Sequence, residues 1–377
     1  MLSKTIKPVA LITIIILLAW VIPSFIPDVQ HASYYEDHEY FRGEVLEVEN
    51  RTTNRAINQQ VKVEVTNGPY QGDKVNVTNY YRENSRHSDV ELDEGIEVLM
   101  YSFYQNGNRS IELHDVARDR GLLRAIIFLG IALLVIGKIK GLKTIVTLAI
   151  TGYIIVRVML PMILAGWSPI PVATGSALII IALTLLIIDG LSPKTIAAFV
   201  GTGVGVLVAG LMAYYIGEVT HITGLTDELQ MLTMARGAFG AGEGTVDIRG
   251  LFYTGIIIGS LGAIIDVGMS IASSATQVKE ANPDISFQEL MFHSLEVGRD
   301  IMGTMSNALI LAYVGGSLPM LLLFLYQNFS WVRIINMDYV AAEILNGVAG
   351  SLGLVVAIPV TSVIASLLLQ GQQNDAS

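Results

Sequence analysis

The residue best suited to chemistry is Asp266, an acidic side chain near the middle of an uninterrupted apolar stretch, residues 251–275. Such a stretch is long enough to cross a bilayer as a helix. A carboxylate at membrane depth costs roughly 2.5–3.5 kcal/mol on insertion scales, so it needs a partner, a cavity or an ion. We therefore expect Asp266 to bind a cation or proton, or to gate a pathway.

Small residues share a helix face with this carboxylate. At 100° per residue, one narrow stripe contains Gly255, Gly259, Gly262, Asp266, Ser270 and Ser273. Glycines four residues apart let another helix approach the backbone closely. The stripe therefore also fits a structural role, in which a tightly packed neighbouring helix hydrogen-bonds to Asp266.

A second polar set begins the next apolar stretch. Asp300, Thr304 and Asn307 fall on one helix face at spacings of four and three. Their carboxylate, hydroxyl and amide oxygens suit Na⁺, Mg²⁺ or a proton relay. The alternative is a favourable charge at a helix N-terminus together with hydrogen bonds between helices.

Arg157 is the candidate counter-charge for Asp266. The two residues differ in expected depth by roughly 7–8 Å, which a long guanidinium side chain could nearly close. Arg157 could instead extend toward the outer surface or meet Asp247 or Glu243 of an outer connection.

A short motif occurs twice in the second half of the chain. Gly259-Ser260-Leu261-Gly262 is repeated as Gly350-Ser351-Leu352-Gly353, which assigns helix packing to Gly350 and Gly353 as well. Both copies would run from outside to inside, as in a parallel repeat. Four residues of this composition also match easily by chance.

The composition is that of a membrane protein. The chain is 52% hydrophobic and 15% charged over 377 residues, and its mean hydropathy is +0.55. We expect a polytopic α-helical membrane protein with about eight transmembrane helices, at 8–27, 121–138, 144–166, 170–188, 196–217, 251–274, 302–326 and 341–369. Lys and Arg gather in the connections on one side, which places both termini in the cytoplasm.

The polar segment is expected to be a small β domain outside the cytoplasm. Alternating patterns predict five strands near 41–49, 61–65, 74–78, 97–101 and 110–113. Short strands with glycine-containing turns favour a closed barrel of OB or SH3-like type. The expected domains are a tail and anchor (1–29), the β-rich domain (30–120), a seven-helix bundle (121–370) and a cytoplasmic tail (371–377).

Several function classes are excluded or disfavoured. The chain has no cysteine, so disulfides, thiolate metal sites and cysteine nucleophiles are absent. Residues 30–120 hold 17 Asp/Glu against 10 Lys/Arg, which disfavours nucleic acid as a partner. No HExxH, GxSxG or Walker A motif occurs. Asp189 and Asp266 are the only approximate pair for an aspartyl protease, and we expect no enzyme, cofactor or metal centre.

Four motifs in order resemble the YibE/F-like family of bacterial membrane proteins. They are Ile188-Asp189-Gly190-Leu191-Ser192-Pro193-Lys194-Thr195, Leu261-Gly262-Ala263-Ile264-Ile265-Asp266-Val267, Gly298-Arg299-Asp300-Ile301-Met302-Gly303-Thr304-Met305 and Leu311-Ala312-Tyr313. The resemblance covers roughly residues 120–370. It implies a bacterial inner-membrane location and a shorter multispan partner of the same family, and it supplies no established activity.

Two hypotheses for function follow. In the first, the protein is a secondary transporter or permease for a small solute or ion, and Asp266 is its coupling or gating site. In the second, it is a non-transporting assembly or envelope-support protein whose outer β domain binds a partner, with a homo-oligomer as another form of assembly. Both place the chain in the lipid bilayer.

Overall fold

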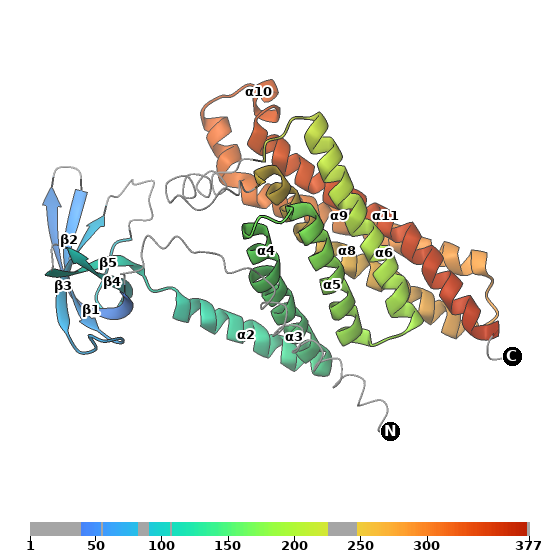
Figure 1. Cartoon of the computed structure of the whole chain (residues 1–377), viewed down its shortest axis with the longest axis horizontal. Helices are drawn as coiled ribbons and strands as arrows, with labels where there is room; N and C mark the ends of the chain where they lie inside the picture. Colours follow the sequence, from blue (N-terminus) through green and yellow to red (C-terminus); the bar gives the residue numbers. More distant parts are fainter. Residues whose placement is uncertain (1–38, 54–55, 82–89, 106–107, 225–246, 375–377) are drawn as a thin grey trace. The chain divides into compact units, whose positions relative to one another are not determined.

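The computed structural model describes residues 39–53, 56–81, 90–105, 108–224 and 247–374 (Figure 1). The chain divides into two compact units at residues 136 and 137. One unit holds a β-sheet and helix α2, and the other holds the remaining helices. The predicted anchor, 8–27, lies outside the described residues.

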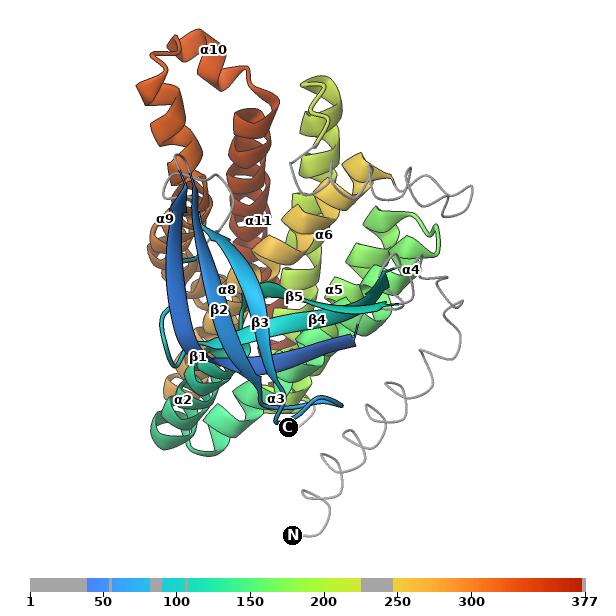
Figure 2. The same cartoon turned by 90° about the vertical axis from the view of Figure 1, so that its left-hand side faces the viewer.

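The first unit is built on a curled antiparallel sheet that contains all five predicted strands. They are β1 (Glu39–Thr53), β2 (Ala56–Val65), β3 (Lys74–Tyr81), β4 (Glu97–Gln105) and β5 (Asn108–Val116). The strand order is β3-β2-β1-β4-β5, and β4 and β5 cross behind β1 to β3 in Figure 2. The curl agrees with a barrel-like domain, and closure into a barrel of OB or SH3-like type stays a prediction.

Alternation along the strands explains why this sheet forms. Val61, Val63 and Val65 of β2 are buried in its core, while the intervening Lys62 and Glu64 point outward. The Lys62 amine lies 3.9 Å from the carboxylate of Glu47 on β1, and the Glu64 carboxylate lies 3.9 Å from the amine of Lys74 on β3. One face of each strand therefore builds the core and the other carries charge.

Helix α2 (Asp119–Gly137) leaves the sheet directly after β5. Two ion pairs fix its first turn to the outward face of the sheet, Arg42 with Asp119 and Glu97 with Arg120. None of its residues is buried. This apolar helix of 19 residues has the length and composition of a membrane span.

The second unit is a helical bundle. Its elements are α3 (Ile139–Ile154), the π-helical turn η2 (Ile155–Met159), α4 (Leu160–Leu164), α5 (Pro169–Asp189), α6 (Pro193–Val219), α8 (Ile248–Ala281), α9 (Phe287–Tyr326), α10 (Trp331–Ile335) and α11 (Asp338–Asn374). Together with α2, seven helical segments in the described part of the chain are long and apolar enough to cross a membrane. Each overlaps one of the seven spans expected after the anchor, although α9 begins at Phe287, well before the expected residue 302.

Side-chain caps begin several of these helices. Ser192 accepts a hydrogen bond from the backbone N–H of Thr195 at the start of α6, and Asp247 accepts one from Gly250 at the start of α8. Ser286 and Glu289 form a complete capping box at the start of α9. These caps fix where α8 and α9 begin.

The centre of the bundle is a close crossing of α6 and α11. A Cβ added to Gly353 of α11 would lie 2.6 Å from the carbonyl oxygen of Gly205, and one added to Gly205 would lie 2.7 Å from the carbonyl oxygen of Gly353. Only glycine permits this approach of two backbones. Helix α8 packs against both through Ile264, whose methyl groups lie next to both glycines.

Candidate functional site

The predicted stripe exists as one face of α8, and that face points away from the protein core. Gly255, Gly259, Gly262, Asp266 and Ser270 are exposed and Ser273 is half-buried. The opposite face carries the buried side chains Ile257, Ile264, Val267 and Ile271. Periodicity therefore predicted which residues lie together, and burial shows that the other helices pack on the opposite side.

The packing role holds for some of the predicted glycines. Gly350 and Gly353 are buried at helix contacts, with Leu309 and Gly205 as their respective neighbours. A Cβ added to Gly255 or Gly262 would meet nothing within 4 Å among the described residues. The expected helix packing is thus absent at these two positions within the described chain.

Gly259 differs, because a side chain of α9 covers it. The hydroxyl oxygen of Tyr313 lies 2.8 Å from the position of a Cβ added to Gly259. Glycine at this position therefore makes room for the tyrosine ring. Tyr313 therefore contacts the stripe at Gly259, and Gly255, one turn nearer the start of α8, stays open among the described residues.

Asp266 has no hydrogen bond or ion pair with any other described residue. The expected counter-charge does not reach it. Arg157 lies in the π-helical turn η2, which packs against α5, and its own side chain is exposed. It forms no ion pair among the described side chains. Within the described chain, Asp266 is therefore an unpaired carboxylate in the middle of a span.

Contacts between α8 and α9 place Thr304 of the second polar set at a depth similar to that of Asp266. A Cβ added to Gly298 of α9 would lie 3.1 Å from Cδ1 of Ile271 on α8. Asp266 follows about 7.5 Å further along α8, and Thr304 follows about 9 Å further along α9 in the same direction, since the two helices are antiparallel. Thr304 and Asp266 thus lie at similar depth, without a hydrogen bond between them.

Asp300, Thr304 and Asn307 are exposed on one face of α9, as predicted. The Thr304 hydroxyl donates a 2.8 Å hydrogen bond to the carbonyl oxygen of Ile301. Helix α9 begins at Phe287, three turns before Asp300. Because helix-terminus effects fade within the first turn, the alternative of a charge at a helix N-terminus is wrong for Asp300.

A further carboxylate, Glu343, lies near one end of a span and was not among the predicted site residues. It lies in the second turn of α11 and accepts a 3.3 Å hydrogen bond from the side-chain amide of Asn346. The signal was present, because Glu343 is a carboxylate inside the span predicted at 341–369. Because Glu343 is the third residue of that span, its position was also consistent with a charge at the membrane surface.

Glu343 lines a cavity of about 320 Å³ between α9 and α11. The wall also includes Tyr313, Ser317, Tyr339 and Trp331, and it is almost entirely apolar. The Tyr339 hydroxyl donates a 3.4 Å hydrogen bond to the Ser317 hydroxyl. Tyr313 lines this cavity and also covers Gly259 of α8, so its side chain lies between the cavity and the stripe.

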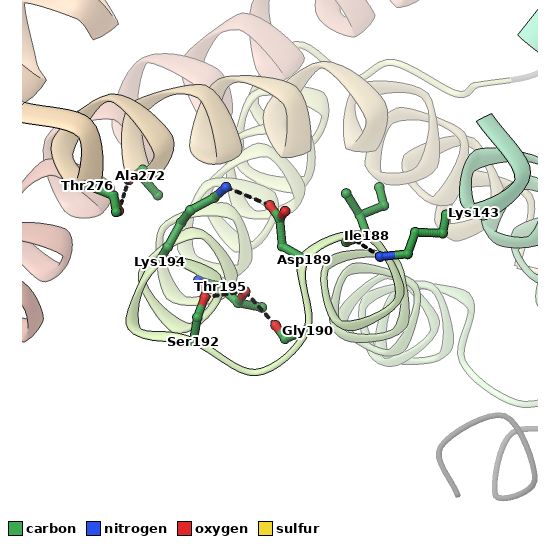
Figure 3. A network of polar contacts seen from close by, with 9 residues as sticks. All are labelled: Lys143, Ile188, Asp189, Gly190, Ser192, Lys194, Thr195, Ala272 and Thr276. Atoms are coloured by element: carbon green, nitrogen blue, oxygen red, sulfur yellow. Dashed lines mark hydrogen bonds and ion pairs between the residues drawn. The ribbon is translucent and has the colours of Figure 1, made fainter. Parts of the chain in front are cut away.

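The motif from Ile188 to Thr195 forms a polar network at the turn between α5 and α6 (Figure 3). The Lys194 amine lies 2.7 Å from a carboxylate oxygen of Asp189, and the two side chains point toward one another. The Lys143 amine donates to the carbonyl oxygen of Ile188 and the Thr195 hydroxyl to that of Gly190, both at 2.7 Å.

This network holds a turn in place. Gly190 adopts a positive φ of 75° there, which a glycine tolerates without strain. Asp189 is engaged by Lys194 at the end of α5, and no hydrogen bond joins it to Asp266 among the described residues. The structure gives the motif a structural role.

The seven long apolar helical segments in the described part of the chain indicate a multi-pass membrane protein. The model of the YibE/F-like protein family matches residues 125–371, about two thirds of the chain. The chain belongs to this family, as the four motifs indicated. No curated protein and no solved structure matches the chain.

Proposed function

We propose that this protein is a permease or secondary transporter for a small solute or ion, and that Asp266 is its coupling or gating group. The observation that carries the proposal is an unpaired carboxylate at mid-span on a face of glycine and serine. Such a group costs several kcal/mol in hydrocarbon unless water, a proton, an ion or another protein meets it. Small neighbours leave room for any of these.

Oxygen-bearing side chains support a path along α8, α9 and α11. Glu343 and Tyr313 lie toward the α10 end of the bundle, Asp266 and Thr304 near the middle, and Asp300 toward the opposite end. No Lys or Arg occurs in residues 250–278 of α8, 300–326 of α9 or anywhere in α11. A path lined by acceptors without fixed positive charge favours cations or protons over anions.

The orientation of the bundle follows from its lysines. Helices of the bundle that alternate in direction bring the start of α3 and the α5–α6 and α8–α9 turns to the end opposite α10. That end holds Lys138, Lys140, Lys143, Lys194 and Lys279. We infer that it faces the cytoplasm of a bacterial inner membrane, which would place residues 30–120 on the outer side.

The test uses the purified full-length protein in vesicles. Flux of H⁺, Na⁺ and K⁺ is measured under an imposed potential for the parent, for Asp266→Asn and for Asp284→Asn. Asp284 is an exposed carboxylate in the α8–α9 turn, so it loses the same charge outside the span. We expect Asp266→Asn to abolish flux and Asp284→Asn to retain it.

Equal flux in the parent and Asp266→Asn would refute the role of the carboxylate. Absence of flux for all three ions in the parent would refute the cation path. Gel filtration and thermal unfolding of each variant separate these results from loss of folding.

The open face of α8 also supports the second candidate, an assembly protein. Gly255 and Gly262 leave room for a helix of another membrane protein, such as a shorter member of the family, and Asp266 would then hydrogen-bond across the contact. If instead the outer β domain binds the partner and the bundle only anchors it, the β domain tethered by a single span such as α2 should rescue a deletion strain. Failure of that rescue would count against it.

A further inference from the structure

A cluster of aromatic side chains lies on the outward face of strands β1, β4 and β5. Tyr40 and Tyr101 are cross-strand neighbours with ring centroids 5.9 Å apart, and His114 meets both rings edge-on at 5.3 and 5.9 Å. Phe103 stacks on Tyr101 at 5.6 Å. Tyr40 is 47% exposed and His114 is exposed, so the cluster is part of the domain surface.

The same face carries the attachment of α2. Arg42, which pairs with Asp119 at the first residue of α2, lies two residues from Tyr40 on β1 and points to the same side of the sheet. Two residues along a strand span roughly 7 Å. The aromatic cluster therefore lies directly beside the point where α2 leaves the sheet.

The length of α2 fixes this point relative to the bilayer. Nineteen residues of helix measure roughly 28 Å, close to the thickness of the hydrocarbon core. The whole helix is then needed to span, and its first turn must lie at headgroup level. Leu122 and Leu123 are followed by Arg124, roughly 7.5 Å along the axis from Asp119, whose long side chain can extend back to the headgroups.

We propose that Tyr40, Tyr101, Phe103 and His114 form a membrane-contact surface that inserts into the headgroup layer of the bilayer that α2 enters. Tyrosine rings with an apolar body and a polar tip favour this layer. The Tyr101 hydroxyl already donates a 2.7 Å hydrogen bond to Glu112, so its polar tip is satisfied on the protein side. The occupant of the surface is lipid.

The absence of cysteine from the chain allows a direct test. Tyr40→Cys and Phe103→Cys are each labelled with a nitroxide in the full-length protein, in vesicles of phosphatidylethanolamine and phosphatidylglycerol. Tyr104→Cys is the matched control, because Tyr104 is 72% exposed and follows Phe103 on the same strand, so its side chain points to the other side.

Collision of each label with oxygen and with a water-soluble nickel complex reports its environment. We expect the labels at residues 40 and 103 to gain access to oxygen and lose access to nickel, relative to the label at residue 104. Equal, water-like access at all three positions would overturn the proposal. That result would leave the surface for a protein partner absent from the vesicles.

Discussion

Two glycines in identical four-residue motifs should respond in opposite ways to the same substitution. In Gly353→Ala the new methyl group would lie 2.6 Å from the carbonyl oxygen of Gly205 and 2.8 Å from the Cβ of Ala209. In Gly262→Ala the methyl group would meet nothing within 4 Å in the described chain. The substitution is the same, and only the packing environment differs.

The magnitudes follow from that difference. Replacing glycine with alanine within a helix is worth about 1 kcal/mol by itself, which applies to both variants. Overpacking costs about 1–3 kcal/mol, and the upper value applies to Gly353 because a carbonyl oxygen cannot rotate out of the way. We expect a net loss of about 2 kcal/mol in the free energy of unfolding for Gly353→Ala, and a gain approaching 1 kcal/mol for Gly262→Ala.

Thermal unfolding of both full-length variants in one detergent measures the contrast. A change of 1 kcal/mol moves the midpoint by about 2–4 °C for chains of 150–250 residues, so the two variants should separate by several degrees. Equal midpoints, or a lower midpoint for Gly262→Ala in monomeric protein, would refute the assignment of Gly353 to the core crossing and of Gly262 to the open face.

Two further predictions concern the sheet. The buried Gln59 side chain accepts hydrogen bonds from the Asn79 amide and from the backbone N–H of Leu92. Gln59→Leu leaves both donors without a partner, so it should reduce the free energy of unfolding of this unit by about 2 kcal/mol. Hydrogen exchange in β2 and β3 measures the loss. A hydrogen bond from Arg118 lowers the pKa of Asp115, so its stabilisation is present above the usual carboxyl pKa and is lost as pH falls through the lowered value. Asp115→Asn should therefore lower the unfolding midpoint at neutral pH, and the difference from the parent should vanish in acid.

Much of the fold was predictable because each element carries its own local signal. Alternation in residues such as Val61, Val63 and Val65 identified the strands, and long apolar runs identified the spans. The lengths of α8 and α9 were less accessible. Helix α8 continues past its apolar residues to end at Ala281, and helix α9 begins at Phe287, well before its apolar residues. The short turn between them and the cap at Ser286 decide these two boundaries.

The sequence predicted which residues form the candidate site, but it did not predict what surrounds them. The helical period shows that Gly262 and Asp266 share a face. It does not show which of the other faces meets lipid and which packs against a helix, because apolar side chains suit both surroundings. The close crossing of α6 and α11 depends on Gly205 and Gly353 meeting across 148 positions of sequence. No local pattern distinguishes the buried copy of the repeated motif from the open one.

The open face of α8 therefore limits what the protein can do. Asp266 on that face requires either water and a solute or a second protein surface, since lipid satisfies neither the charge nor its hydrogen bonds. Gly262→Ala distinguishes these cases in the membrane. If a helix of another chain covers the stripe, the added methyl group should weaken assembly while leaving the monomer stable. If the stripe borders a pathway, assembly should be unchanged and flux should fall, because the methyl group narrows the space beside Asp266.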